Sequence, residues 1–296
     1  MQKNSTHKAG FVNIIGKPNA GKSTLMNALM GEKLSIITYK AQTTRHRIMG
    51  IMSGDDFQIV YSDTPGYIEP KYELQKTMMS FVQESLEDAD ILLLVIDPQD
   101  TFDDQGLLEK IRQSSTPLLI VLNKIDLLEQ AKVFALLEEW QQAFPQAEII
   151  PLSALQQFNI EKLFERIMAL LPEHPAYFDK EEMTDKSERF LAAEMIREQI
   201  FLNYEQEIPY STDVQITTFK EYTDQIHIHA EIFVERDSQK GIIIGKKGEA
   251  LKKVGTEARK SMEEFFKKKV FLEQHVKVEP DWRKNKQKLQ RLGYHG

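Results

Sequence analysis

The chain contains no cysteine, and this absence removes several kinds of chemistry at once. Its 296 residues can form no disulfide, thiolate metal site, thiol nucleophile or lipidated cysteine. The sequence also lacks an apolar run near 18 residues, so we expect no transmembrane helix. The first eight residues have no apolar segment behind their charges, so we expect no signal peptide. These absences favour a cytoplasmic protein.

Positive charge is scarce over most of the chain and concentrated at its end. Residues 236–296 contain 17 Lys+Arg and 8 Asp+Glu, a net charge of +9, whereas residues 1–235 carry −16. A basic end on an acidic body suggests that the end binds a polyanion. A solvated lysine-rich surface explains the charge alone equally well. The length favours two domains.

Residues 16–23 read GKPNAGKS, which is the pattern of a phosphate-binding loop. The loop follows an apolar run at 11–15, typical of a buried strand, and precedes an amphipathic helical run at 23–30. Its backbone N–H groups and the helix N-terminus would face phosphate oxygens. Lys22 would reach the β- and γ-phosphates, and the Ser23 hydroxyl would bind Mg²⁺. The sequence therefore predicts a nucleoside triphosphate site. The other residues expected to line it are Asn19, Ala20, Gly21 and Thr24.

Up to about residue 171, short apolar runs alternate with amphipathic segments. The expected strands are 11–15, 46–52, 57–62, 91–97, 118–123 and 148–151. The expected helices are 22–30, 73–87, 104–113, 130–142 and 160–170. This alternation predicts an α/β domain with a mostly parallel sheet and helices on both faces. The short connection between 46–52 and 57–62 predicts one antiparallel hairpin. Ligands of such sheets bind at the carboxyl ends of the strands.

A second, smaller α+β pattern follows a polar stretch without apolar periodicity. Its expected elements are helix 187–203, strands 213–219 and 225–235, a glycine-rich turn at 241–248, helix 249–266 and strand 270–278, with a short basic terminal helix at 281–292. We therefore expect an N-terminal tail (1–9), a nucleotide-binding domain (10–171), a linker (172–186) and a second domain (187–296).

Three further motifs bear on the nucleotide. Asp63 ends a predicted strand and can hold Mg²⁺ through a water, and the Gly66 N–H can meet the γ-phosphate. Guanine presents N1–H and its N2 amino group on one edge, and the Asp126 carboxylate can accept both, which adenine cannot match. In the same Asn123–Asp126 motif the Lys124 stem would cover one face of the base. Backbone N–H groups of Ser153, Ala154 and Leu155 would meet guanine O6.

These ordered motifs resemble those of translation-factor-class GTPases over roughly residues 9–171. Within Gln42–Arg45, which is similar to the first switch of that class, the resemblance favours Thr44 over Thr43 as a Mg²⁺ ligand, because Thr44 directly precedes the arginine. It implies Lys22, Thr44 and Gly66 as catalytic residues. It also implies Ser23, Thr44 and, through a water, Asp63 at the metal.

Two departures from Ras-like proteins concern the mechanism. Tyr67 and Ile68 follow Gly66, where Ras-like enzymes have a water-orienting glutamine, so we expect slow intrinsic hydrolysis. Asn19 is similar to the asparagine with which potassium-stimulated GTPases hold K⁺. A cation there would neutralise charge developing between the β- and γ-phosphates. Alternatively, Asn19 merely caps the loop.

The second domain carries a Gly-x-x-Gly turn, Gly245–Gly248, between an apolar run and an amphipathic helix. Such a turn lets a nucleic-acid backbone approach, with Lys246 and Lys247 facing phosphates. The unit resembles a type II KH domain over about residues 187–278, which implies a single-stranded RNA ligand at Ile244–Gly248. An unrelated α+β domain with a lysine-bearing turn is the alternative.

Smaller features leave two readings each. His227 and His229 share one strand face, which suits either a metal or a plain half-exposed surface. The lysines at 267–269 would reach RNA phosphates or remain a solvated helix end. Trp282 would stack on a base or pack in the domain.

With Ala41–Arg47 and Leu289–Tyr294 added, the whole chain resembles the Era family of bacterial GTPases. The resemblance implies GTP hydrolysis with Mg²⁺, binding near the 3′ end of 16S rRNA, and a role in assembly of the 30S ribosomal subunit. The family's peripheral association with the inner face of the cell membrane has no counterpart in an amphipathic surface helix here. We expect a monomer. The alternative function is an RNA-binding assembly scaffold in which GTP is structural and its hydrolysis incidental.

Overall fold

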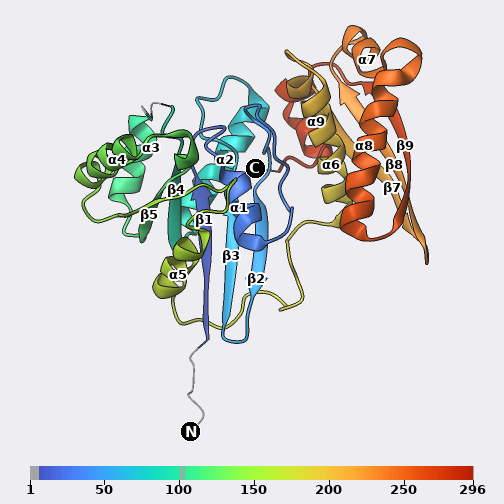
Figure 1. Ribbon diagram of the computed structural model, residues 1–296. Helices are drawn as coiled ribbons and strands as arrows, with labels where there is room; N and C mark the ends of the chain where they lie inside the picture. The colour runs from blue at the N-terminus through green and yellow to red at the C-terminus, as the bar shows by residue number, and fades with distance from the viewer. Residues whose placement is uncertain (1–6, 101, 103, 296) are drawn as a thin grey trace. The chain divides into compact units, whose positions relative to one another are not determined.

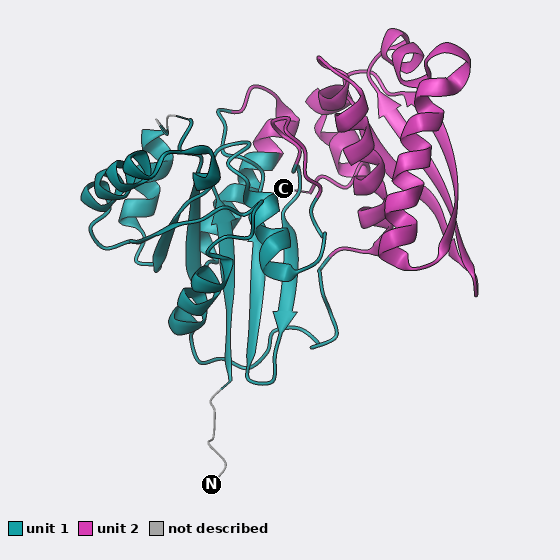
Figure 2. Cartoon of the chain, in the orientation of Figure 1, with its two compact units in different colours: residues 1–35, 44–69, 78–185 teal, residues 36–43, 70–77, 186–296 magenta. Residues whose placement is uncertain are grey.

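The computed structural model describes residues 7–100, 102 and 104–295, and its contacts divide the chain into two compact units. Unit 1 comprises residues 1–35, 44–69 and 78–185 (Figure 2). Unit 2 comprises residues 36–43, 70–77 and 186–296, so two short segments of the N-terminal half belong to it. Of the N-terminal tail expected at 1–9, residues 1–6 lie outside the described part, and a strand already begins at Lys8.

Unit 1 is built on a six-stranded sheet in the order β2-β3-β1-β4-β5-β6 (Figure 1). The strands are β1 (Lys8–Ile15), β2 (Ile48–Ser53), β3 (Phe57–Asp63), β4 (Ile91–Ile96), β5 (Leu118–Leu122) and β6 (Glu148–Pro151). β2 and β3 pair antiparallel, as the short connection between them predicts, and the other neighbours pair parallel. The carboxyl ends of five strands therefore lie along one edge of the sheet, where ligands of such folds bind.

Helices cover both faces of this sheet because its central strands are apolar throughout. They are α1 (Lys22–Met30), α2 (Glu73–Glu87), α3 (Gln105–Gln113), α4 (Gln130–Ala143) and α5 (Ile160–Leu170). On one face, Leu92, Leu94 and Ile96 of β4 join a core cluster with apolar residues of α2, α3 and α4. The alternate residues of β4 are equally buried, as expected for a parallel strand covered on both sides.

Unit 2 contains a three-stranded sheet in the order β7-β8-β9 with helices against it. Its elements are α6 (Glu188–Asn203), β7 (Asp213–Glu221), β8 (Gln225–Val234), α7 (Asp237–Ile244), α8 (Glu249–Phe266), β9 (Lys269–Val278) and α9 (Lys286–Arg291). β7 and β8 pair antiparallel, whereas β8 and β9 pair parallel. The order of these elements is the one that the resemblance to a type II KH domain implies.

The sheet of unit 2 has one buried and one open face. Every second residue of β8, from Ile226 to Val234, is buried under the helices, while the residues between them are partly exposed. Trp282 is fully buried, and its indole N–H donates to the Ser211 carbonyl at 3.0 Å. Of the two readings of Trp282, the structure therefore supports packing in the domain.

The sequence predicts the α/β sheet and the α+β unit correctly, but two local details differ. Residues 241–244, expected in the glycine-rich turn, instead form the end of α7, a helix that is not among the elements expected for this domain. The terminal helix expected at 281–292 is split into a 3₁₀ turn (Trp282–Lys284) and α9. Asn285 separates them, since its side chain accepts hydrogen bonds from the backbone of Gln287 and Lys288 as an N-cap.

The segment expected as a linker, 172–186, is hydrogen-bonded to unit 1 along much of its length. Ala9 N–H donates to the Pro172 carbonyl, Ile51 N–H to the Met183 carbonyl, and Gln58 bonds the backbone at 177 and 178. This segment is therefore held to the sheet of unit 1 as far as Asp185. The Asp185 carboxylate accepts a hydrogen bond from the Met49 N–H at 2.9 Å.

Candidate nucleotide site and RNA-binding turn

The backbone of the phosphate loop uses conformations that favour glycine. Gly16 has φ +153° and Gly21 φ +93°, and Asn19 at the loop's exposed tip has φ +63°. A Cβ at Gly16 would lie 2.4 Å from the Val95 carbonyl oxygen, and one at Gly21 would lie 2.2 Å from the Asn123 amide nitrogen. Both glycines are therefore required for the loop to pack against the ends of β4 and β5.

Lys22 and Asp63 are buried charged groups at the centre of this site. The Lys22 Nζ donates to the carbonyls of Lys17 (2.8 Å) and Gly16 (3.2 Å). Burial lowers the pKa of Lys22 to about 8, and the nearby Asp63 opposes that change. Burial raises the pKa of Asp63, opposed by Lys22 and by the hydrogen bond from Ser23. A triphosphate bound in this loop would add anionic charge beside Lys22.

Three oxygen ligands predicted for Mg²⁺ lie together in the structure. Ser23 Oγ is 2.7 Å from Asp63 Oδ2 and 3.0 Å from Thr44 Oγ1, and Thr44 Oγ1 is 3.3 Å from Asp63 Oδ2. Within the described part of the chain, no residue donates a hydrogen bond to the buried Asp63 Oδ1. Oxygen donors of this kind fit Mg²⁺. The hydroxyl of the neighbouring Thr43 instead donates to the Lys40 carbonyl.

Gly66 is pressed against the phosphate loop. A Cβ at Gly66 would lie 2.6 Å from Pro18 Cα, and the next N–H, that of Tyr67, donates to the Gly16 carbonyl at 3.0 Å. The Tyr67 ring packs on the core cluster beside α2 and α3. Neither Tyr67 nor Ile68 carries an amide or carboxylate with which to orient water.

Asn123 connects two of the predicted nucleotide-binding segments. Its side-chain amide donates to the Ala20 carbonyl at 2.8 Å and accepts from the Ala154 N–H at 3.0 Å. The Ser153 N–H donates to the Phe158 carbonyl. The Leu155 side chain is exposed. The contact between the backbone N–H groups of residues 153–155 and guanine O6 stays a prediction.

Lys124 and Asp126 lie directly after Asn123, at the carboxyl end of β5. Lys124 has φ +58°, and its Nζ pairs with Asp97 Oδ2 at 2.6 Å, which holds the stem in place. Asp126 is exposed on a 3₁₀ turn (Ile125–Leu127). Sequence reasoning missed Asp97. Its position directly after β4, at the same edge of the sheet, was the available signal. Thr24, also predicted here, is half-buried on α1.

Residues 36–43, which precede Thr44, are anchored within unit 2 on the last turns of α6. The buried Lys40 Nζ donates to the carbonyls of Phe201 (2.7 Å) and Tyr204 and pairs with Glu205. These carbonyls are near the C-terminus of α6, where helix acceptors lack helical partners. Ile37 N–H also donates to Glu198 Oε1 at 3.1 Å. No sequence signal marks Lys40, because its acceptors lie about 160 residues away.

Residues 70–77 are held in unit 2 by a second set of contacts. The Arg283 guanidinium lies 5.4 Å from the centre of the Tyr72 ring. The Gln75 side chain donates to Gln42 Oε1 at 3.2 Å, which joins this segment to residues 36–43. Both segments therefore form part of the unit that contains the KH-like fold.

The Gly245–Gly248 turn presents two lysines to solvent at the start of α8. Gly245 (φ +71°), Lys247 (φ +51°) and Gly248 (φ +80°) make the backbone turn sharply between α7 and α8. Lys246 and Lys247 are exposed. Ile244, predicted as an RNA contact, packs partly on the core, whereas Ile242, which sequence reasoning missed, is 50% exposed. An N-terminal helix end with two lysines suits a phosphate backbone.

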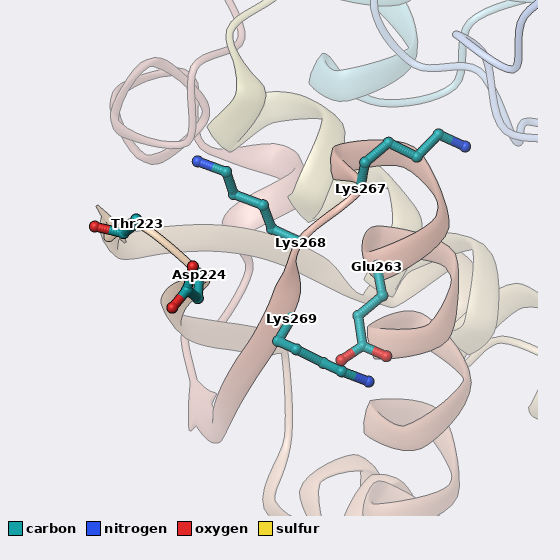
Figure 3. Close-up of a pocket in the computed structure, with 6 residues that line it drawn as sticks. All are labelled: Thr223, Asp224, Glu263, Lys267, Lys268 and Lys269. Atoms are coloured by element: carbon teal, nitrogen blue, oxygen red, sulfur yellow. The ribbon is translucent and has the colours of Figure 1, made fainter.

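The structure also shows the surroundings of His229 and of the lysines at 267–269, for which the sequence leaves two interpretations. His229 Nε2 lies 2.9 Å from His275 Nδ1, but no group of three or more metal-ligating side chains occurs among the described residues. The three lysines at 267–269 line an open pocket of about 540 Å³ with Thr223, Asp224 and Glu263 (Figure 3). Lys268 pairs with Glu221 at 2.6 Å.

Comparison with known proteins agrees with this arrangement. Residues 11–124 match a family model described as 50S ribosome-binding GTPase, and residues 207–283 match the KH domain model. The fold and the site thus define a P-loop GTPase joined to a KH domain.

Relatives extend this likeness to nearly the whole chain. GTPase Era of Syntrophus aciditrophicus is 47% identical over 291 residues, covering 97% of this chain and 95% of the relative. GTPase Era of Clostridium kluyveri is 43% identical, with 97% and 99% covered. The chain belongs to the Era family of GTPases.

Two solved Era structures are similar to both units. One is Era in complex with MgGDPNP and nucleotides 1506–1542 of 16S ribosomal RNA, with a TM-score of 0.94 and 40% identity, covering 98% of this chain and all of the other. The other is a variant of Aquifex aeolicus Era bound to GDP·AlF₄⁻, with a TM-score of 0.92, 39% identity and the same coverage. Within the described residues, no helix is both long and apolar enough to cross a membrane.

Proposed function

We propose that this protein hydrolyses GTP and binds 16S rRNA near its 3′ end during assembly of the 30S ribosomal subunit. One observation carries the proposal. The residues predicted for a guanine-nucleotide site and a Gly-x-x-Gly turn occur on one chain, and a protein similar over its full length was solved with MgGDPNP and 16S nucleotides. We further propose a cytoplasmic monomer with Mg²⁺ as cofactor. Peripheral membrane association is supported only by the family resemblance.

The proposed site residues divide the work by position. Lys22 would hold the β- and γ-phosphates, and the Gly66 N–H would donate to the γ-phosphate. Ser23 and Thr44, with Asp63 through a water, would hold Mg²⁺, which neutralises phosphate charge. Asp126 would select guanine while Lys124, fixed by Asp97, covers the base. Among these residues, only Thr44 directly follows a segment of unit 2 in the sequence, namely residues 36–43.

This position of Thr44 in the chain supports coupling between nucleotide binding and RNA binding. Binding of Thr44 at the metal would fix the end of residues 36–43, which are bonded to α6 through Ile37 and Lys40. We expect RNA and GTP to strengthen each other's binding by the same factor. The test compares the affinity for a 16S 3′-end oligonucleotide between the GDP-bound and GTP-analogue-bound protein. Equal affinities would refute the coupling.

Lys40→Met should weaken this coupling without removing either ligand. The change keeps the buried stem but removes the charge that bonds the α6 carbonyls. We expect the ratio of RNA affinities between the two nucleotide states to fall at least about fivefold, the lower end of typical coupling energies. GTP-analogue affinity should change less than about twofold. Lys132→Met, on the exposed surface of α4, is the matched control. An unchanged ratio in Lys40→Met would contradict this role.

Asn19 provides a test of cation dependence. Its exposed side chain lies at the tip of the phosphate loop, where a monovalent cation would meet the charge that develops during hydrolysis. We expect faster hydrolysis in KCl than in NaCl at equal ionic strength, and loss of that difference in Asn19→Ala. Equal rates in both salts for the wild type would leave Asn19 as a loop cap.

The scaffold alternative is favoured by one observation, the absence of a water-orienting side chain at Tyr67 and Ile68. If GTP were structural, single-turnover hydrolysis would have the same rate with and without the 16S 3′-end oligonucleotide. We expect the oligonucleotide to accelerate it.

A further inference from the structure

The open face of the unit 2 sheet carries an aromatic cluster, formed by Tyr222, His227 and Phe271. These residues belong neither to the nucleotide site nor to the Gly245–Gly248 turn. Lys220, His227 and Phe271 lie side by side across β7, β8 and β9 in register. Their β8 neighbours Ile226 and Ile228 point into the core, so this row faces away from the helices.

The rings of this cluster are in contact with one another and open to solvent. The His227 ring centre lies 5.0 Å from that of Tyr222 and 5.2 Å from that of Phe271. Tyr222 is 49% exposed and Phe271 53% exposed. Neighbouring aromatic faces that remain accessible are the usual platform for stacking unpaired bases, as on the sheets of several RNA-binding modules.

Positive charge extends from the Gly245–Gly248 turn along α8 to the turn between β7 and β8, which precedes His227. Residues 246–269 contain nine Lys+Arg and four Asp+Glu, a net charge of +5. These residues end at the pocket that Lys267, Lys268 and Lys269 line together with the turn between β7 and β8 (Figure 3). Two carboxylates partly neutralise this charge. Glu221 forms an ion pair with Lys268, and Glu263 forms an ion pair with Arg259 and accepts a hydrogen bond from the Val270 N–H. Lysine is depleted in protein–protein interfaces, whereas nucleic-acid grooves need it.

The distance from the Gly245–Gly248 turn to the pocket at the end of α8 fits one RNA strand. α8 has 18 residues, so about 27 Å separate the turn at its start from the pocket at its end. A KH module clamps about four nucleotides. At roughly 3.4 Å per stacked nucleotide, 27 Å corresponds to about eight more.

We propose that single-stranded RNA bound at the Gly245–Gly248 turn continues along α8 and stacks unpaired bases on Tyr222, His227 and Phe271. This inference rests on the proposed RNA binding at the turn. It adds a second contact surface, with stacking as its chemistry and the lysines at 267–269 facing the phosphates.

Binding of two RNA lengths tests the proposal on the full chain. Fluorescence anisotropy would give the affinities for a 4-nucleotide and a 12-nucleotide unstructured RNA at fixed salt. For Tyr222→Ala/Phe271→Ala we expect the 12-mer affinity to fall about 10-fold or more, since each lost stack weakens binding severalfold. The 4-mer affinity should stay at the wild-type value. Phe134→Ala, which truncates an exposed aromatic on α4 of unit 1, is the matched control.

A second variant guards against a general disturbance of the sheet. Phe271→Trp keeps an aromatic face, so its 12-mer affinity should match the wild type, and the new indole fluorescence should be quenched by the 12-mer but not by the 4-mer. Wild-type 12-mer affinity in the double variant, or equal losses for both lengths, would overturn the proposal, as would absence of quenching. Failure of the wild type to bind the 4-mer would instead contradict the proposed RNA binding at the turn.

Discussion

Replacing Gly245 by aspartate is expected to lower the affinity for single-stranded RNA by about 100-fold, roughly 2.7 kcal/mol, and to leave GTP affinity unchanged. Gly245 has φ +71°, and a Cβ there would lie 2.6 Å from the Ala250 Cβ at the start of α8. The turn would have to open, and a carboxylate would lie where phosphate is expected. The measurement is anisotropy with the 16S 3′-end oligonucleotide, beside titration with a fluorescent GTP analogue.

Gly241→Asp is the matched control, since it adds the same charge one helical turn earlier. Gly241 is exposed in α7, and a Cβ there would meet nothing within 4 Å. We expect a loss of less than about fivefold, from charge repulsion alone. Equal losses in both variants would mean that the backbone of the turn has no special role. Wild-type affinity in Gly245→Asp would remove the turn from the RNA interface altogether.

Asp126→Asn is expected to weaken GTP binding by about 100-fold to 1,000-fold, because two charge-assisted hydrogen bonds to guanine are lost. The asparagine amide cannot accept from both N1–H and the N2 amino group. It can donate to the O2 carbonyl of xanthine, so xanthosine triphosphate should bind the variant better than GTP does. Competition titration with the two nucleotides measures the change of preference.

Asp100→Asn removes the same charge from an exposed position after β4 and serves as the control. Its preference for GTP should equal that of the wild type. RNA affinity of the Asp126→Asn protein without nucleotide should also be unchanged. If Asp126→Asn still preferred GTP to the same degree, the assignment of Asp126 to the base would be wrong.

The features that were predictable from the sequence are encoded in contiguous residues. The phosphate loop from Gly16 to Ser23, the antiparallel hairpin of β2 and β3 and the turn at Gly245 each depend on glycine placement and on the apolar pattern beside it. These patterns identified the α/β class, the KH-like unit and the family. Boundaries were less predictable, as α7 shows: its last residues, 241–244, were expected in a glycine-rich turn.

Several functional details were not predictable because their partners are distant in sequence. Lys40 reads as an ordinary surface lysine until the last turn of α6 brings the Phe201 and Tyr204 carbonyls to it. Asn123 belongs to a predicted nucleotide-binding motif, but the sequence does not show that its amide bonds both the Ala20 carbonyl and the Ala154 N–H. The Tyr222, His227 and Phe271 cluster depends on the register of three strands.

The sequence by itself determined which chemistry we predict for the chain: phosphate binding by a glycine-rich loop, guanine selection by Asp126 and RNA binding at a turn that contains two lysines. Only the tertiary structure decided how these parts are connected. It joined residues 36–43 to α6, fixed Lys124 through Asp97 and placed exposed rings in a row. The physical reason is that local backbone preferences are written in neighbouring residues, whereas burial and long-range hydrogen bonds arise only when distant segments pack together.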